Sequence, residues 1–165
     1  MPKELTHFTI AEQIFQSMEP SWLKKHVQKH LDLYFIGAVT HDTPYYLRGK
    51  WRPHFQALAA CLHGTNGEDT YLNLKNLLNI YGPEMPDYVL SFACGLFTHI
   101  FIDSEFHPLV YYLTGDYNAR DPVLRMQAVC RHRQWEAGLD MYFTDRLKTC
   151  RTSRLKNHIA GKKIS

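Results

Sequence analysis

The chain is patterned for helices along nearly its whole length. Apolar residues recur three and four positions apart over residues 3–18, with His7 beside the inner stripe. Alternation with a period of two, the signature of strands, is nearly absent. Glycines and prolines divide the chain into predicted helices at 3–18, 21–37, 53–62, 68–81, 86–106 and 122 to about 150. The pattern predicts an all-α, single-domain helical bundle over residues 1–150.

Composition adds limits on size, charge and location. The 165 residues are 45% hydrophobic and 21% charged, which suits one globular domain with a core, and the net charge of +3 is too mild to indicate nucleic acid. From Arg146 onward there are seven Lys or Arg and no acid, so residues 151–165 are predicted to be a solvated basic C-terminal tail rather than a contact for an anionic surface.

The first residues show no apolar signal region, and the apolar run 88–102 is too short to cross a bilayer. The four cysteines include no Cys-x-x-Cys pair and are most simply reduced thiols. These observations predict a cytoplasmic protein without a transmembrane segment.

Candidate chemistry is concentrated in GLFTHIFIDSEFHP, residues 95–108. His99, Asp103 and His107 lie four apart inside an otherwise apolar stretch, so the first two share one face of a helix. A bare carboxylate in apolar surroundings is costly unless it is paired or bound to a cation. Pro108 disfavours continued helix, and a turn of the chain is predicted just after His107. This cluster points to a metal ion.

The last predicted helix repeats the arrangement in RHRQWEAGLD. His132 and Glu136 are four apart on a face that adjoins Trp135 and Leu139. Asp140, one turn further on, is predicted to hold a ligand imidazole in the right tautomer. Chance alone accounts for about one His with an acid four later, so the apolar setting of these pairs carries more weight than their spacing.

Further candidates come from helix ends and loops. His7 on the first helix, Asp42 after the apolar run LYFIGAV, and His63 before Gly64 would each, taken alone, more often be a core or helix-end residue. Together the candidates suit zinc or another first-row metal, since Ca²⁺ and Mg²⁺ prefer all-oxygen ligands. They are too many for one tetrahedral ion and suffice for two, so a buried multinuclear site is predicted. The candidate ligands are His7, Asp42, His63, His99, Asp103, His107, His132 and Glu136.

In their order along the chain these motifs resemble the bacterial zinc-dependent phospholipase C family, over residues 7–136. The resemblance implies a mostly helical domain that holds a cluster of three zinc ions, so two or three ions are predicted in all. It implies that Asp103 bridges two ions, one of which His7 joins. The other bridged ion would also take Asp42, His63 and His99, and a separate ion would take His107, His132 and Glu136.

The function predicted from these residues is metal-dependent phosphoester hydrolysis. A water activated between metals near Asp103 would attack phosphorus, with Asp42 orienting it or acting as general base. The substrate would be a phospholipid head group or a small phosphodiester, with nucleic acid less favoured. Aromatic residues after Asp42 are predicted either to form an apolar lip that selects the substrate or to pack in the core; they are Tyr45, Tyr46, Trp51 and Phe55.

The alternative is a non-catalytic metal-binding helical module. In such a module the metals hold the helices of the bundle together, and the basic tail binds a partner. A di-iron carboxylate bundle ranks low, because it expects Glu-x-x-His pairs on two helices and this chain has His-x-x-x-acid pairs instead.

Overall fold

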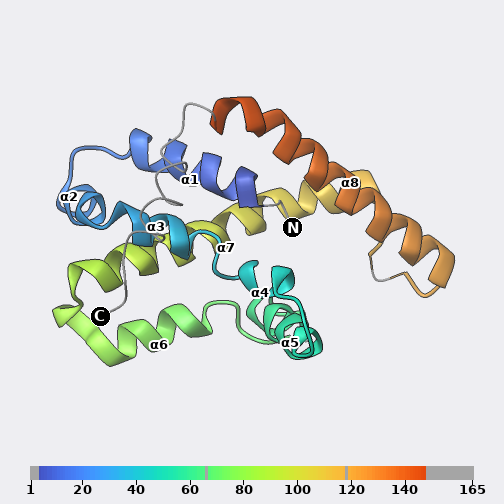
Figure 1. Cartoon of the computed structure of the whole chain (residues 1–165), viewed down its shortest axis with the longest axis horizontal. Coiled ribbons are helices and arrows are strands. Elements are labelled where there is room, and N and C mark those ends of the chain that lie inside the picture. The colour runs from blue at the N-terminus through green and yellow to red at the C-terminus, as the bar shows by residue number, and fades with distance from the viewer. Residues whose placement is uncertain (1–3, 66, 118, 148–165) are drawn as a thin grey trace. The chain divides into compact units, whose positions relative to one another are not determined.

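The computed structural model describes residues 4–65, 67–117 and 119–147, and within these ranges every regular element is helical. The prediction of an all-α fold is therefore confirmed (Figure 1). The elements in chain order are α1 (Glu4–Ser17), α2 (Trp22–Lys29), α3 (Leu31–Gly37), α4 (Thr43–Tyr46), α5 (Arg52–Leu62), α6 (Leu72–Tyr81), the 3₁₀ turn η1 (Gly82–Glu84), α7 (Asp87–Thr114) and α8 (Pro122–Leu147).

The helix predicted at 21–37 is two helices. Ser21 caps α2 as expected, because its hydroxyl accepts a hydrogen bond from the backbone N–H of Lys24 at 3.2 Å. The backbone then leaves helical geometry at His30, with φ −130° and ψ 48°, and α3 begins at the next residue. Nothing in the apolar periodicity marks this break, because both halves keep the same spacing of three and four.

The prediction that the chain turns just after His107 is wrong. α7 continues through Pro108 to Thr114. A proline inside a helix removes the N–H that would bond the carbonyl four residues earlier, here that of Ser104, at a cost of about 3 kcal/mol. Ser104 and Pro108 are both exposed, so water can hydrate that carbonyl. The turn that follows buries Val110 and Thr114, which offsets the cost.

α7 is also long and apolar enough to cross a membrane. Its best 18-residue window has a mean hydropathy of 1.3, and 56% of that window is buried inside the protein. The core helix of a water-soluble protein meets the same criterion, so among the described residues this is weak evidence for a membrane span.

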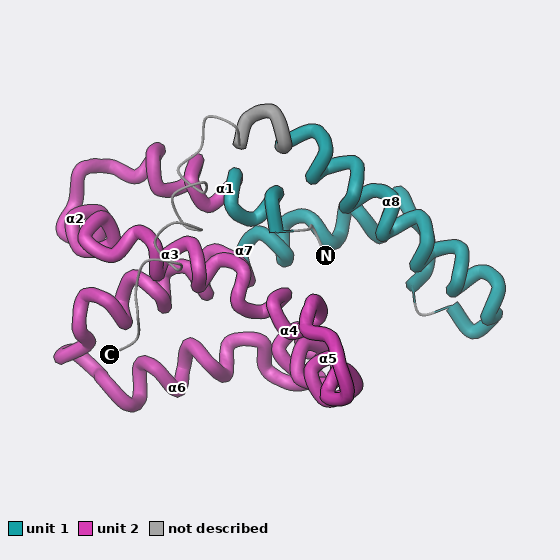
Figure 2. The backbone as a smooth tube through the Cα atoms, viewed as in Figure 1, with its two compact units in different colours: residues 1–9, 101–165 teal, residues 10–100 magenta. Residues whose placement is uncertain are grey.

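The chain divides into two compact units, shown in Figure 2. Unit 1 contains residues 1–9 and 101–165, and unit 2 contains residues 10–100. The division falls inside α1 and inside α7, so each of these helices contributes residues to both units. The predicted boundary between a domain of residues 1–150 and a basic tail lies outside the described residues and stays a prediction.

The core of unit 2 depends on a close approach of α3 and α7 at two glycines. A Cβ atom added to Gly95 would lie 2.9 Å from the Cα of Gly37, 2.8 Å from the backbone nitrogen of Ala38, and in overlap with the carbonyl oxygen of Tyr34. Only residues without a side chain let two helix backbones come this near. The contact brings the end of α3 next to the middle of α7.

Unit 1 joins the start of α1 to α8 through a buried carboxylate. Asp140 Oδ1 accepts hydrogen bonds from the backbone N–H of Thr6 at 3.0 Å and from its hydroxyl at 2.7 Å. The first N–H groups of a helix have no partner within the helix, and a carboxylate is favourable there. Asp140 therefore fixes the segment that carries His7.

Candidate metal centre

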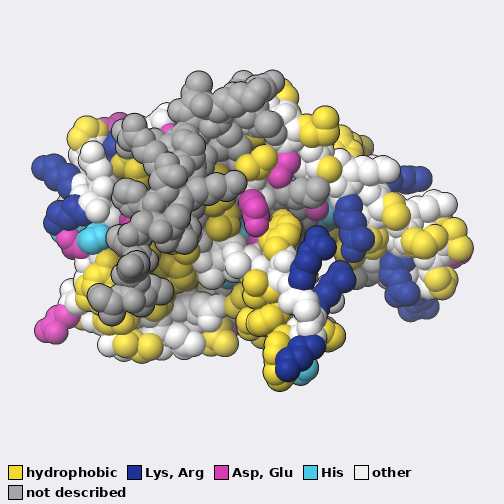
Figure 3. All heavy atoms as spheres, in the orientation of Figure 1, with side chains coloured by type: hydrophobic (Ala, Val, Ile, Leu, Met, Phe, Trp, Pro, Cys, Tyr) yellow, Lys and Arg dark blue, Asp and Glu magenta, His cyan; other side chains and the backbone are white. Residues whose placement is uncertain are grey.

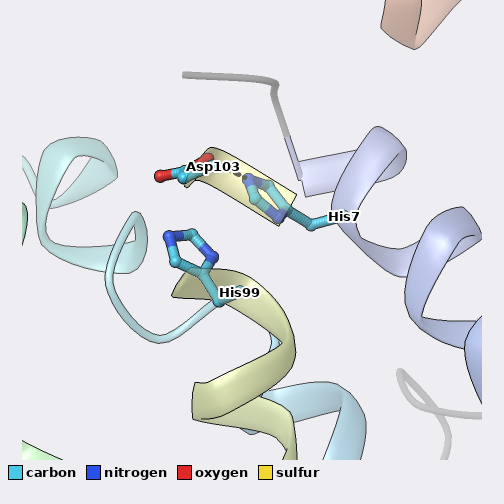
Figure 4. Close-up of side chains that lie close together, drawn as sticks. All are labelled: His7, His99 and Asp103. Atoms are coloured by element: carbon cyan, nitrogen blue, oxygen red, sulfur yellow. Dashed lines mark ion pairs between the residues drawn. The ribbon is translucent and has the colours of Figure 1, made fainter. Parts of the chain in front are cut away.

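The continuous helix α7 places two candidate ligands on successive turns. His99 and Asp103 project from the same face and are 1% and 8% exposed (Figure 4). In unit 1 the fully buried His7, from α1, lies beside the carboxylate, with His7 Nε2 3.4 Å from Asp103 Oδ1. The carboxylate of Asp103 is thus buried beside an imidazole nitrogen.

In unit 2 the orientation of two imidazoles is fixed by the backbone. His99 Nδ1 lies 2.8 Å from the carbonyl oxygen of Ala38, and His63 Nδ1 lies 2.6 Å from that of Ala59. A carbonyl oxygen can only accept a hydrogen bond, so each Nδ1 must carry the proton and donate it. In the neutral ring, Nε2 of both histidines is then the nitrogen that bears the lone pair.

Those two lone pairs converge with a buried carboxylate. His99 Nε2 lies 3.5 Å from His63 Nε2, and His63 Nε2 lies 3.2 Å from Asp42 Oδ1. One ligand atom from each of the three residues lies within 4.8 Å of the other two. Two imidazole nitrogens and a carboxylate oxygen that face one point could hold a cation between them. Two imidazoles and one carboxylate form a donor set that suits zinc.

His41 is a residue that the sequence reasoning missed. Its ring is 1% exposed and stacks on that of His99, with centroids 4.9 Å apart and planes at 10°. It also meets the ring of His63 nearly at right angles, with centroids 5.8 Å apart. The contact holds both imidazoles in place from one side. Its position directly before Asp42 in GAVTHDTPYY could have suggested a role at the site. A loop without periodicity, however, does not show which of its side chains point inward.

The remaining candidates gather in unit 1. His132 Nε2 lies 2.6 Å from Glu136 Oε1 across one turn of α8, and both residues are buried. The ring of His107, from α7, has its centroid 5.9 Å from that of His132. Burial, together with the neighbouring His107, lowers the pKa of His132 to about 4, although the negative charge of Asp103 acts in the opposite direction. The imidazole is therefore neutral at pH 7, the form that binds metals.

Two tyrosines that the sequence did not single out line this group. The rings of Tyr111 and Tyr117 have centroids 5.5 Å and 5.3 Å from that of His132, and they border an open cavity of about 430 Å³ with Gly115 and Asp116. Burial raises the pKa of Tyr111. Tyr111 follows His107 by four residues, a spacing on one helix face that could have identified it.

The structure thus brings the eight predicted ligands into local groups, each within one unit. In unit 2 these are Asp42, His63 and His99. In unit 1 they are His7 with Asp103, and His107 with His132 and Glu136. Their role as metal ligands stays a prediction. Asp140 is bonded to Thr6, and its predicted hold on a ligand imidazole stays a prediction as well.

Comparison with known proteins agrees with a zinc-binding protein. The family model described as zinc dependent phospholipase C matches residues 6–164, nearly the whole chain. No curated protein and no solved structure matches the chain. A match of this extent, on a helical fold with buried His and Asp groups able to bind metal, shows that the chain belongs to the zinc-dependent phospholipase C family, whose description is that of a metal-dependent phospholipid hydrolase.

Proposed function

We propose that this protein is a zinc-dependent hydrolase of phosphoesters that uses an activated water, with a phospholipid-type substrate. The observation that supports the proposal best is the convergence of His63 Nε2, His99 Nε2 and Asp42 Oδ1 in unit 2. Because backbone carbonyls hold both Nδ1 protons, the two Nε2 atoms carry no proton in the neutral rings and can only accept. Such a group would bind a cation.

The residues divide by the ion that they would hold. Asp42, His63 and His99 would bind one zinc ion, and His107, His132 and Glu136 would contribute ligands to another. The predicted sharing of Asp103 between ions, and the addition of His7 to one of them, follow from the family resemblance and stay predictions. The number of ions is left to measurement.

When bound, zinc lowers the pKa of a coordinated water toward 7 and stabilises negative charge on phosphoryl oxygens. The chain supplies the orientation and the proton acceptor. Asp42 is fully buried, so its carboxylate is shielded from competing bulk water and can orient the attacking water or accept its proton. Ala38 and Ala59 hold His99 and His63 in the tautomer that presents Nε2.

The substrate proposal is a phospholipid, with a small soluble phosphodiester as the second choice and nucleic acid less favoured. Action in the cytoplasm stays a prediction.

The first experiment measures metal and turnover together. Full-length protein purified without chelators is analysed for metal, then assayed on bis-(p-nitrophenyl) phosphate and on a water-soluble short-chain phospholipid. We expect at least one zinc per chain and hydrolysis of one of the substrates. Asp42→Asn and Asp103→Asn should each lower kcat by about a hundredfold or more.

His26→Gln is the matched control. His26 is a histidine of unit 2 paired with Asp87 at 3.4 Å, away from the predicted ligands. It should keep the metal content and the turnover. Stoichiometric zinc without turnover on any substrate would favour the non-catalytic metal-binding module, and well under one metal per chain after metal-replete expression would refute the hydrolase.

A further inference from the structure

The segment between Asp42 and His63 carries a surface that the proposed chemistry does not use. Every residue from 46 to 54, here named the aromatic–basic loop, is exposed. Its large apolar side chains are exposed: Tyr46 is 46% exposed, Leu47 40% and Trp51 56%. Exposed Trp and Tyr close together in sequence are unusual on a surface that meets only water.

The same loop is strongly basic. Arg48, Lys50 and Arg52 lie within it, and no Asp or Glu occurs between residues 43 and 67. Lys50 Nζ lies 5.4 Å from the ring centroid of Trp51, so cation and aromatic ring form one mixed surface. Over α4 and α5, Figure 3 shows Lys and Arg side chains interspersed with hydrophobic ones. A partner for this surface must be both anionic and apolar.

The loop connects α4 to α5 through a glycine turn. Gly49 has φ +98°, a conformation that L side chains rarely adopt, and it turns the chain between α4 and α5. Pro44 is buried at the start of α4. The loop therefore runs from the end of α4 to the first turn of α5 through a turn at Gly49.

The loop also adjoins the candidate metal ligands of unit 2. Asp42 precedes α4 and His63 follows α5, so the loop joins two of the three converging residues. The ring of Tyr45, the residue just before the loop, has its centroid 5.6 Å from that of His63. A phosphoester-containing surface that binds the loop would therefore place its phosphoesters near these ligands.

An anionic lipid bilayer has the required chemistry. Trp and Tyr favour the interface between head groups and acyl chains, where one part of the ring is apolar and the other is wet. Lys and Arg near an anionic surface each contribute about a factor of five in binding. We propose that the aromatic–basic loop docks this protein on membranes that contain anionic phospholipid. This proposal rests on the proposed function only in taking phospholipid as the substrate. Membrane docking itself does not require hydrolysis.

The test is co-sedimentation of full-length, zinc-loaded protein with vesicles. One set is phosphatidylcholine alone and the other is phosphatidylcholine with phosphatidylglycerol, and the lipid is analysed after each run so that hydrolysis is detected. We expect binding to the anionic vesicles that weakens as salt is raised, because salt screens surface charge. Lys50→Gln and Trp51→Ala should each lower the partition coefficient about fivefold, and the double variant on the order of 20-fold.

Lys25→Gln and Trp22→Ala are the matched controls. Both positions lie in unit 2 and are exposed, Trp22 at 65%, but they belong to α2, where Asp87 pairs with Lys29 and His26. Their partition coefficients should stay within a factor of two of the wild-type value. Helical circular dichroism checks that every variant is folded.

Two results would overturn docking by the loop: unchanged binding in the double variant, or an equal loss in the controls. Binding to a single-stranded oligonucleotide in preference to the anionic vesicles would overturn it as well. If vesicles bind through the loop while neither vesicle lipid nor soluble substrate is hydrolysed, docking stands and the hydrolase proposal fails. If the soluble substrate is hydrolysed and the vesicles are not bound, the hydrolase proposal stands and docking fails.

Discussion

A methyl group added at Gly95 has no room where α7 meets α3. The Cβ of an alanine would lie 2.9 Å from the Cα of Gly37 and 2.8 Å from the nitrogen of Ala38. Carbon atoms prefer separations of about 3.5–4.0 Å, so the two helices must move apart by about 1 Å. Neither of the two opposing atoms belongs to a flexible side chain, so the backbone itself has to shift.

The displacement acts on both stability and metal affinity. His99 is one turn after Gly95, and its Nδ1 lies 2.8 Å from the carbonyl of Ala38, a bond that about 1 Å of separation would break. Overpacking costs about 1–3 kcal/mol and the lost hydrogen bond about 1 kcal/mol, while alanine gains about 1 kcal/mol of helix propensity over glycine. We expect a net loss of about 1–3 kcal/mol and a fall in Tm of about 2–12 °C.

Urea unfolding with a chelator measures the free energy, and zinc titration by calorimetry measures the affinity. Losing the bond that orients a ligand imidazole should weaken zinc binding about 10–100-fold. Gly138→Ala in α8 is the matched control, because nothing lies within 4 Å of an added Cβ there and the helix should gain about 1 kcal/mol. Wild-type stability and zinc affinity in Gly95→Ala would refute the close approach of α3 and α7.

Three further results are expected. Thr6→Val removes the hydroxyl that donates to the buried carboxylate of Asp140 at 2.7 Å, so urea unfolding should show a loss of about 1.5–3 kcal/mol, and a change below 0.5 kcal/mol would contradict the bond's importance. Burial raises the pKa of Tyr34 from 10.0 to about 12, so the folded state holds this proton more tightly than the unfolded one, and stability should fall as pH rises from 10 to 12. Tyr34→Phe should lose that slope and about 1 kcal/mol, because the hydroxyl no longer donates to the carbonyl of Ala11 at 3.0 Å; a slope that survives the substitution would belong to another group. Chelation of zinc should lower the free energy of unfolding by about 2.7 kcal/mol relative to protein with zinc at a hundredfold excess over Kd, and Tm should fall with it. An unchanged Tm would argue against any bound ion.

The sequence was most informative where a helix has one buried face. The repeat of three and four over residues 3–18 predicted α1 nearly to its ends, and the spacing of His99 and Asp103 placed both side chains correctly on one face. These are local properties of a helix and need no knowledge of the partner surface. The prediction of buried, inward-facing ionisable groups therefore holds for these residues.

The sequence was misleading where tertiary packing outweighed a local rule. Pro108 was expected to end its helix, but burial of Val110 and Thr114 beyond it continues α7. His30 interrupts a run that kept its helical spacing, and His41 sits in a turn with no periodicity to direct it. Local preferences are worth about 1–3 kcal/mol each, which the burial of one further helical turn can exceed.

The bonds from Ala38 and Ala59 to the two imidazoles have a consequence for how this protein tolerates mutation. Because the acceptors are main-chain oxygens, no side-chain replacement at either position can delete them, whatever it does to packing. A side chain that orients a metal ligand can be removed by a single substitution. The main-chain carbonyls of Ala38 and Ala59 remain as long as the ends of α3 and α5 stay folded. Random mutagenesis screened for zinc retention should therefore return hits at the candidate ligands, histidine and carboxylate alike, and at bulky replacements of neighbouring small residues. None of the hits should act by removing the carbonyl that accepts the Nδ1 proton.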